Sequence, residues 1–179
     1  MESNITYKGE SCELTDDFID VGYMAENIEV MDINGKTVEL KRSHVNKAMT
    51  LLISFPHTKD DFMEEVQRID AFMSAIQVDI YCYFIFASEF EDKILLKDKL
   101  EKFDIVFDKE NEFGSMYGTE IVNGSLEGLL TKSLFLISKD GAIFYLDMPG
   151  DLEKPLDLER LQIELNKAYT AYTGVGCHD

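Results

Sequence analysis

The residues of this chain best suited to redox or covalent chemistry are its three cysteines, Cys12, Cys82 and Cys177. They are widely spaced and form no Cys-x-x-Cys pair, and the chain has only three histidines. No metal-ligand cluster of known spacing is therefore present in the sequence. An odd number of cysteines in a reducing compartment also argues against a disulfide framework. The sequence predicts neither a metal site nor a cofactor.

Two of these thiols also have an interpretation without a redox role. Cys82 lies inside an apolar run, where burial suppresses thiolate formation, so we interpret it as a core residue. Cys177 precedes His178 in a C-terminal tail, about residues 173–179, that we expect to be flexible. His178 could help to ionise Cys177, but an exposed thiol on such a tail more often has no redox role. Both cysteines stay open as candidate redox thiols.

A second chemically suggestive segment runs from Pro56 to Met63, between an apolar strand and a helix. The free N–H groups of a helix N-terminus lower the pKa of a thiol placed there, so a reactive cysteine would be most useful at this point. The position holds Met63, which has no ionisable proton. His57 could act as a base, but no nucleophile accompanies it, and we interpret it as a polar turn residue. The nearby carboxylates fit a solvated helix start better than a cation site: Asp60, Asp61, Glu64 and Glu65.

Composition narrows the choice of partners. The chain has 179 residues and a formal net charge of −18, so phosphate backbones and anionic membranes are unsuitable partners. No apolar stretch approaches the roughly 20 residues of a membrane span. The N-terminus shows no basic region followed by an apolar run, which predicts a cytosolic location.

Turn signals and apolar runs predict the strands. We expect hairpins over 4–14 and 28–40, with turns at Lys8-Gly9 and Asn34-Gly35. Runs that are apolar on both faces predict buried strands at 48–55, 79–87 and 133–137. Lys139-Asp140-Gly141 predicts a turn from the last of these into a strand over 142–146.

Helical periodicity predicts four helices among these strands. The first covers 61–76, with Thr58, Asp60 and Asp61 as possible caps, and the second runs from the capping box Ser88-x-x-Glu91 to Leu100. A short third helix covers 111–117, and the fourth follows a cap at Asp157 and turns Leu158, Leu161, Leu165 and Tyr169 inward. The fold class is therefore α/β, a mixed sheet between helical layers in one domain over 1–179.

Several segments are similar to the thiol peroxidase subfamily of peroxiredoxins, the atypical two-cysteine type. They include ITYKGESCEL (5–14), VGYMAENIEVMDINGKTVEL (21–40), LLISFP (51–56), QRIDAF (67–72), FASEF (86–90) and EFGSMYGTEIVNGSLEGLLTKSLFLISKDGAIFY (112–145). The resemblance implies a thioredoxin-like three-layer sandwich with an N-terminal β-hairpin, and a homodimer.

The catalytic signature of that family is Pro-x-x-x-Thr-x-x-Cys, followed much later by an arginine. On this sequence Pro56 matches the proline, whereas Asp60 falls on the threonine and Met63 on the peroxidatic cysteine. The resolving cysteine falls on Asp98 and the arginine on Lys132. The resemblance thus implies the fold of a thiol peroxidase whose catalytic positions are degenerate.

Two functions follow from this comparison. In the first, the protein no longer reduces peroxides and is a non-enzymatic binding or regulatory paralogue, with a small ligand or an active relative as partner. In the second, it is a thiol-dependent peroxidase or oxidoreductase in antioxidant defence that works through Cys177 or Cys82.

Overall fold

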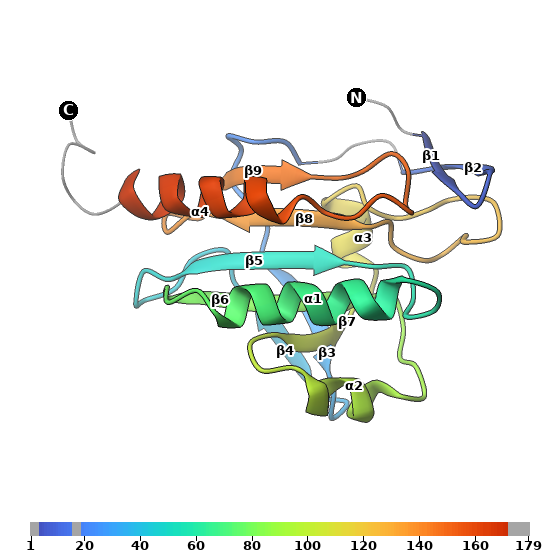
Figure 1. Cartoon of the computed structure of the whole chain (residues 1–179), viewed down its shortest axis with the longest axis horizontal. Coiled ribbons are helices and arrows are strands. Elements are labelled where there is room, and N and C mark those ends of the chain that lie inside the picture. The colour runs from blue at the N-terminus through green and yellow to red at the C-terminus, as the bar shows by residue number, and fades with distance from the viewer. Residues whose placement is uncertain (1–3, 16–18, 172–179) are drawn as a thin grey trace.

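The structure is a computed structural model that describes residues 4–15 and 19–171. Seven strands form a mixed sheet in the order β4-β3-β7-β6-β5-β8-β9 (Figure 1). Their bounds are β3 Ile28–Asp32, β4 Thr37–Leu40, β5 Met49–Ser54, β6 Ile80–Phe86, β7 Asp104–Phe107, β8 Ser133–Ile137 and β9 Ile143–Asp147. The pairs β5–β6 and β6–β7 are parallel, and the other neighbours are antiparallel. The N-terminal hairpin, β1 (Asn4–Tyr7) and β2 (Glu10–Glu13), forms a separate two-stranded sheet.

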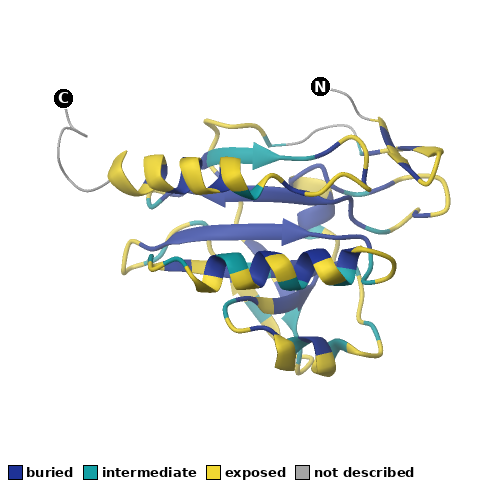
Figure 2. Cartoon of the chain, viewed as in Figure 1, coloured by how far each residue is buried: buried dark blue, intermediate teal, exposed yellow. Residues whose placement is uncertain are grey.

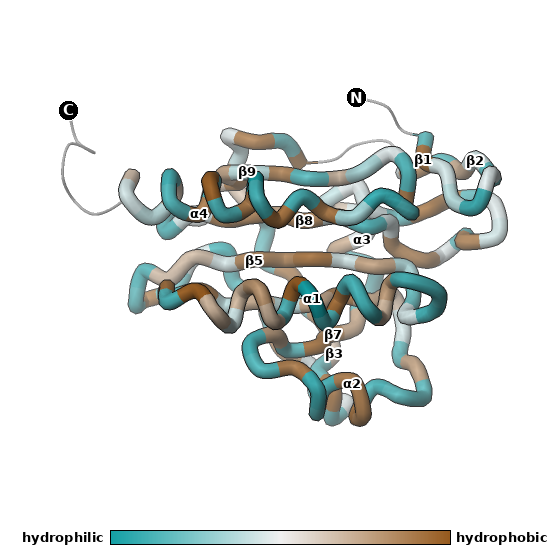
Figure 3. Tube along the Cα trace, in the orientation of Figure 1, coloured by the Kyte–Doolittle hydropathy of each residue, from teal (hydrophilic) through white to brown (hydrophobic). Residues whose placement is uncertain are grey.

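Helices cover the two faces of the large sheet unequally. Helices α1 (Phe62–Ser74), α2 (Lys93–Lys99) and α4 (Leu158–Ala171) pack on one face, and α3 (Glu112–Met116) packs on the other. Each face has its own buried apolar cluster. All six residues of β5 are buried, as the unbroken dark blue of that strand shows in Figure 2. Figure 3 shows the corresponding alternation of apolar and polar residues along α1 and α4.

Most of the predicted elements are confirmed. Both early hairpins turn at the predicted glycine positions, and the three apolar runs form β5, β6 and β8 with bounds within one residue of those expected. A further strand, β7, lies between the second and third helices. The Asp157 carboxylate accepts a hydrogen bond from the backbone N–H of Arg160 at 3.0 Å, which confirms the cap of α4.

The predicted capping box at Ser88 is wrong, because α2 begins only at Lys93. The Phe90 ring lies edge-on to Phe86 and Phe107, at centroid distances of 5.0 and 5.9 Å. Glu89 forms ion pairs with Lys93 and Lys109 instead of supporting a helix start. Docking of the Phe90 ring and this ion pairing hold the segment in a non-helical path.

Two details of the other helices also differ from expectation. Tyr169 is 49% exposed, because Ala168 takes the inward position of that turn and the Tyr169 ring instead lies under the Lys139 ammonium. At the start of α1, Asp61 occupies the N-cap position but its side chain makes no capping hydrogen bond. Local backbone hydrogen bonds close this end of the helix instead, from the Phe62 N–H to the Lys59 carbonyl at 3.2 Å and from the Glu65 N–H to the Asp61 carbonyl at 3.0 Å.

Two further findings bear on function. Among the described residues, no helix is both long enough and apolar enough to cross a bilayer. Cys177, His178 and the tail at about 173–179 lie outside the described residues.

The N-terminal hairpin is fixed to the body of the protein by a close approach between Cys12 and Gly124. Gly124 has φ +84°, and a Cβ at this position would lie 2.6 Å from the Sγ of Cys12. The hairpin makes further hydrogen bonds to neighbouring loops, from Asn123 and Ser125 to Glu13 and Glu10. Gly124 is therefore required both by its backbone conformation and by the thiol beside it.

We predict that Gly124→Ala lowers the free energy of unfolding by about 2 kcal/mol, the sum of left-handed strain and the clash with Cys12. Cys12→Ala in the same background removes the clash but leaves the strain, so it restores part of the loss. Urea unfolding of the two single variants and the double variant measures both contributions. Additive effects of the two substitutions would contradict the clash.

Candidate functional site

The segment from Pro56 to Met63 leaves the carboxyl end of β5 and enters α1, at an edge of the sheet where ligands of α/β folds commonly bind. Pro56 is buried, and Met63 lies half-buried in the first turn of α1, where it packs against the core. The structure therefore confirms that the thioether occupies a helix N-terminus. A thioether has no proton to lose, so the local field of the helix cannot turn it into a nucleophilic anion.

The N-terminal hairpin reaches this segment and binds Asp60. The Tyr7 hydroxyl donates a hydrogen bond to Asp60 Oδ2, and Lys8 Nζ lies 2.9 Å from the same oxygen. These two partners, Tyr7 first, hold the pKa of Asp60 below its usual value. Asp60 has φ 55°, and the contacts with Tyr7 and Lys8 offset the cost of this backbone conformation.

Beneath the first turns of α1 lies a buried ion pair between Lys132 and Glu65. Lys132 Nζ is 2.6 Å from Glu65 Oε1, and the two side chains are 1% and 6% exposed. Lys132 also donates to the carbonyl oxygen of Lys154 at 2.8 Å, and the second oxygen of Glu65 accepts from the backbone N–H of Leu156 at 2.7 Å. Interpreting Glu65 as part of a solvated acidic helix start is therefore wrong.

Aromatic rings complete the surroundings of the ammonium group. Lys132 Nζ lies 5.7 Å from the ring centroid of Phe55 and 5.3 Å from that of Phe62. Lys132 thus lies beside the first turns of α1. Its positive charge, however, is satisfied by Glu65, one carbonyl group and two rings.

The space left between these groups is small. A cavity of about 30 Å³ remains, lined by Tyr7, Asp60, Asp61, Phe62, Glu65, Lys132, Leu152 and Glu153. This volume suits about one water molecule and no organic ligand. Met63 is not among the residues that line it.

The remaining candidate residues are not brought to this cluster. Asp98 lies exposed on α2, which packs on β7 at a distance from the hairpin and the start of α1 (Figure 1). Cys82 is buried in β6, and burial raises its pKa to about 12. Cys12 is also buried, and burial is the main cause that raises its pKa. Neither of these thiols is suited to ionise at neutral pH.

His57 is held at the site as a neutral acceptor. Its Nδ1 accepts a hydrogen bond from the backbone N–H of Lys59 at 3.1 Å, and its ring lies edge-on to Tyr7 and Phe62. Burial is the largest cause that lowers the pKa of His57, and the charges of Lys59 and Lys8 add to it against the opposing effect of Asp60. The prediction of a polar turn residue agrees with these contacts.

We predict that acidification weakens the fold at His57. A histidine with a lowered folded-state pKa stabilises the fold above its unfolded pKa, 6.5, and this contribution is lost as the pH falls through the folded value. His57→Asn keeps an acceptor for Lys59 but cannot titrate. Chemical unfolding of both proteins between pH 7.5 and 5 should show that the wild type loses more stability than the variant. Parallel curves would contradict this role.

No protein-family model matches the sequence. A thiol peroxidase of Campylobacter jejuni is 34% identical over 67 residues, and the matched segment covers 37% of this chain and 37% of that protein. The chain is therefore matched to just over a third of its curated relative.

Similarity to solved structures extends over almost the whole chain. A peroxiredoxin-like protein from Aquifex aeolicus superposes with a TM-score of 0.84, covering 94% of this chain and 98% of that one at 15% identity. A thiol peroxidase from Chromobacterium violaceum superposes with a TM-score of 0.82, covering 94% and 99% at 15% identity. The chain has the thioredoxin-like fold of the peroxiredoxins, and together with its partial sequence match this makes it a protein similar to the thiol peroxidases.

Proposed function

We propose that this chain is a single-domain, thiol-peroxidase-like protein that has lost peroxide reduction and acts as a non-enzymatic binding or regulatory paralogue. The observation that carries the proposal is Met63, a thioether at the start of α1, where the chemistry needs a thiolate. We assign Asp60 and Lys132 to further degenerate positions of the same site, with Pro56 retained, and Asp98, on α2 away from it, to the degenerate resolving position.

The chemistry explains why Met63 would end turnover. In peroxide reduction a thiolate sulfur attacks one peroxide oxygen, the O–O bond breaks, and sulfenic acid and hydroxide form. A methionine sulfur can also take an oxygen atom from peroxide, giving a sulfoxide and water, but the sulfoxide needs a separate reductase before the protein can react again. Asp60 adds a negative charge near the place where an anionic nucleophile would form.

The ion pair supports the same proposal. A cation that stabilises a thiolate must have charge to offer it. The Lys132 ammonium instead has Glu65 at 2.6 Å and the Lys154 carbonyl oxygen at 2.8 Å. The positive charge of Lys132 is therefore neutralised by Glu65 inside the fold and does not stabilise an anion at the N-terminus of α1.

Binding is proposed at the surface of the protein. The 30 Å³ cavity beside Lys132 leaves no room for an organic ligand, so a partner protein fits this region better than a small molecule. We propose a cytoplasmic homodimer, which could also pair with an active peroxiredoxin relative.

A peroxidase assay tests the proposal. Purified protein with hydrogen peroxide or an alkyl peroxide, and thioredoxin or dithiothreitol as reductant, is expected to show only the uncatalysed rate. Mass spectrometry after mild peroxide treatment is expected to find oxygen on methionines. Fast turnover, with a stoichiometric sulfenic acid or disulfide at Cys177 or Cys82, would establish the alternative of a thiol-dependent peroxidase.

A further inference from the structure

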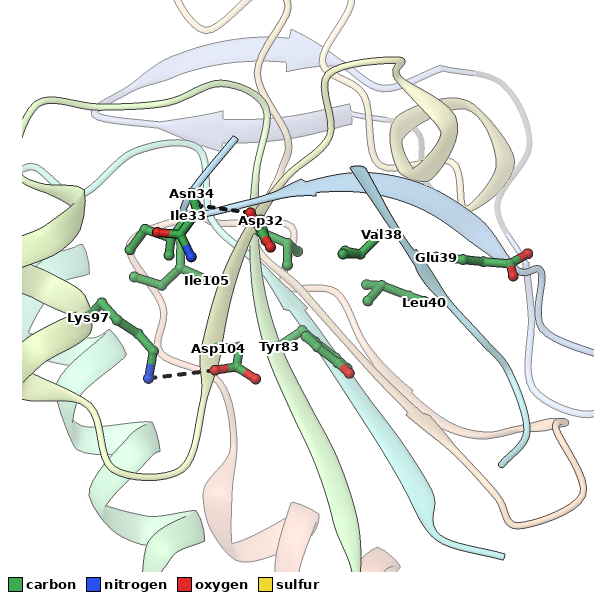
Figure 4. Close-up of a pocket in the computed structure, with 11 residues that line it drawn as sticks. Asp32, Ile33, Asn34, Val38, Glu39, Leu40, Tyr83, Lys97, Asp104 and Ile105 are labelled. Carbon is green, nitrogen blue, oxygen red and sulfur yellow. Dashed lines mark hydrogen bonds and ion pairs between the residues drawn. The ribbon is translucent and has the colours of Figure 1, made fainter. Parts of the chain in front are cut away.

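A much larger cavity lies at the other edge of the sheet, between the β3–β4 hairpin and strands β7 and β6 (Figure 4). Its volume is about 420 Å³. Strand β3 pairs with β7 only through Met31–Phe107 and Asp32–Val106, and the chain then turns away into β4. The first two residues of β7, Asp104 and Ile105, pair with β6 alone. The cavity lies in the gap that opens where the β3–β4 hairpin diverges from β7.

Part of the wall of this cavity is apolar. Val38 and Leu40 come from β4, Tyr83 from β6, and Ile105 and Val106 from β7. Val38 and Tyr83 are half-buried, so part of their apolar surface lies open to a ligand. The volume falls within the range of small-molecule sites, which are concave and mostly apolar with a few polar groups.

The charged groups at the cavity are mainly carboxylates. Figure 4 shows Asp32 and Asp104 at two sides of the cavity, while Glu39 points away from it. Asp32 Oδ1 accepts from the backbone N–H groups of Asn34 and Lys36, and the second oxygen takes no part in these bonds. Lys97 Nζ lies 3.6 Å from Asp104 Oδ1, a long and partly exposed pair that is easily exchanged.

Tyr83 lies in the same negatively charged surroundings, close to Asp104. Burial is the largest cause that raises the pKa of its hydroxyl, and the charge of Asp104 adds to it. The phenol therefore stays protonated, so its O–H can donate a hydrogen bond within an acidic wall. The net charge of −18 further raises the local concentration of cations and lowers that of anions.

We propose that this cavity binds a small organic cation with an apolar body, such as an arylalkylamine. The apolar part lies against Val38 and Tyr83, in front of the buried Leu40 and Val106, and the ammonium group pairs with Asp32 or Asp104 at the rim. This binding is independent of any chemistry at Met63, since it uses residues of the opposite sheet edge. A non-enzymatic binding protein could thus bind small organic cations at this cavity, although the 30 Å³ cavity beside Lys132 is too small for them.

The test uses phenethylamine as probe, with phenethyl alcohol and hydrocinnamate as neutral and anionic controls of similar shape. Titration of the full chain at low salt, followed by amide chemical shifts, is expected to give a Kd of about 1 mM for the amine. Shifts are expected at Val38, Leu40, Tyr83 and Val106. The alcohol should bind about tenfold more weakly, and hydrocinnamate should not bind measurably.

Variants locate the site. Asp104→Asn changes one exposed carboxylate and is expected to weaken amine binding about fivefold, while Asp98→Asn, on α2 but outside the cavity lining, leaves it unchanged. Val38→Trp fills the cavity and should abolish binding in a protein that still gives a folded spectrum. Equal affinity for amine and alcohol, or insensitivity to Asp104→Asn and Val38→Trp, would overturn the proposal. Binding of a lysine-rich peptide without binding of phenethylamine would also overturn it, in favour of a protein partner.

Discussion

Lys132→Met is expected to lower the free energy of unfolding by about 3–5 kcal/mol. The substitution removes the counter-ion of the buried Glu65 carboxylate, which then keeps only the hydrogen bond from the Leu156 N–H. It also removes the donor that bonds to the Lys154 carbonyl oxygen. A buried charge without its counter-ion keeps the full cost of desolvation, whatever the intact pair contributes. Urea unfolding at neutral pH measures the loss.

Two further variants separate the ion pair from a general effect of removing a lysine. Lys167 lies 3.7 Å from Glu164 and is 60% exposed, so Lys167→Met should cost at most about 0.5 kcal/mol. The double variant Lys132→Met, Glu65→Leu removes both charges and should recover much of the loss, although the groups at 154 and 156 lose their partners. Equal effects of Lys132→Met and Lys167→Met would contradict the buried pair.

The sequence predicts those parts of the fold that depend on local patterns. The run over 48–55 is apolar at nearly every position, and it forms β5, buried on both faces. Asn34-Gly35 places the turn between β3 and β4, and Asp157 caps α4 because its acceptor lies three residues before the N–H of Arg160. In each case the determining residues are neighbours in the chain.

The candidate site depends on residues that are distant in the sequence. Tyr7 and Asp60 are 53 positions apart, and Glu65 and Lys132 are 67 apart, so no local pattern indicates either contact. The resemblance places Lys132 at the site, but it cannot show that Glu65 neutralises it. The error at Ser88 has the same origin, because Phe90 is positioned by Phe86 and Phe107 and not by its own helix.

Met63→Cys alone is expected to give a protein that reduces peroxide no faster than an ordinary exposed thiol. With a thiol pKa of about 8.5, only a few per cent is thiolate at pH 7. The field of the helix N-terminus favours the thiolate, but partial burial of the side chain and two nearby groups offset this effect. Asp60 is an ionised carboxylate three positions away, and the charge of Lys132 is paired with Glu65.

A set of changes should restore the thiolate. Asp60→Thr removes the carboxylate near the thiol. Lys132→Arg introduces a planar guanidinium group, whose N–H groups can donate two parallel hydrogen bonds. Glu65→Gln removes the negative charge that neutralises this cation. Together with Met63→Cys they are expected to lower the thiol pKa by at least about one unit and to raise the peroxide rate at pH 7 about tenfold. The thiol pKa is measured from the pH dependence of alkylation, and the rate from consumption of peroxide.

The design includes controls for folding and for the nucleophile. Met63→Ser with the same three changes has no thiol and should remain inactive. If the fourfold variant is unfolded, the rate of Met63→Cys at pH 9 still tests the argument, because ionisation alone should then raise it about 25-fold over pH 7. A single Met63→Cys variant as fast as the fourfold variant would show that Asp60, Glu65 and Lys132 do not hold this site away from thiol chemistry.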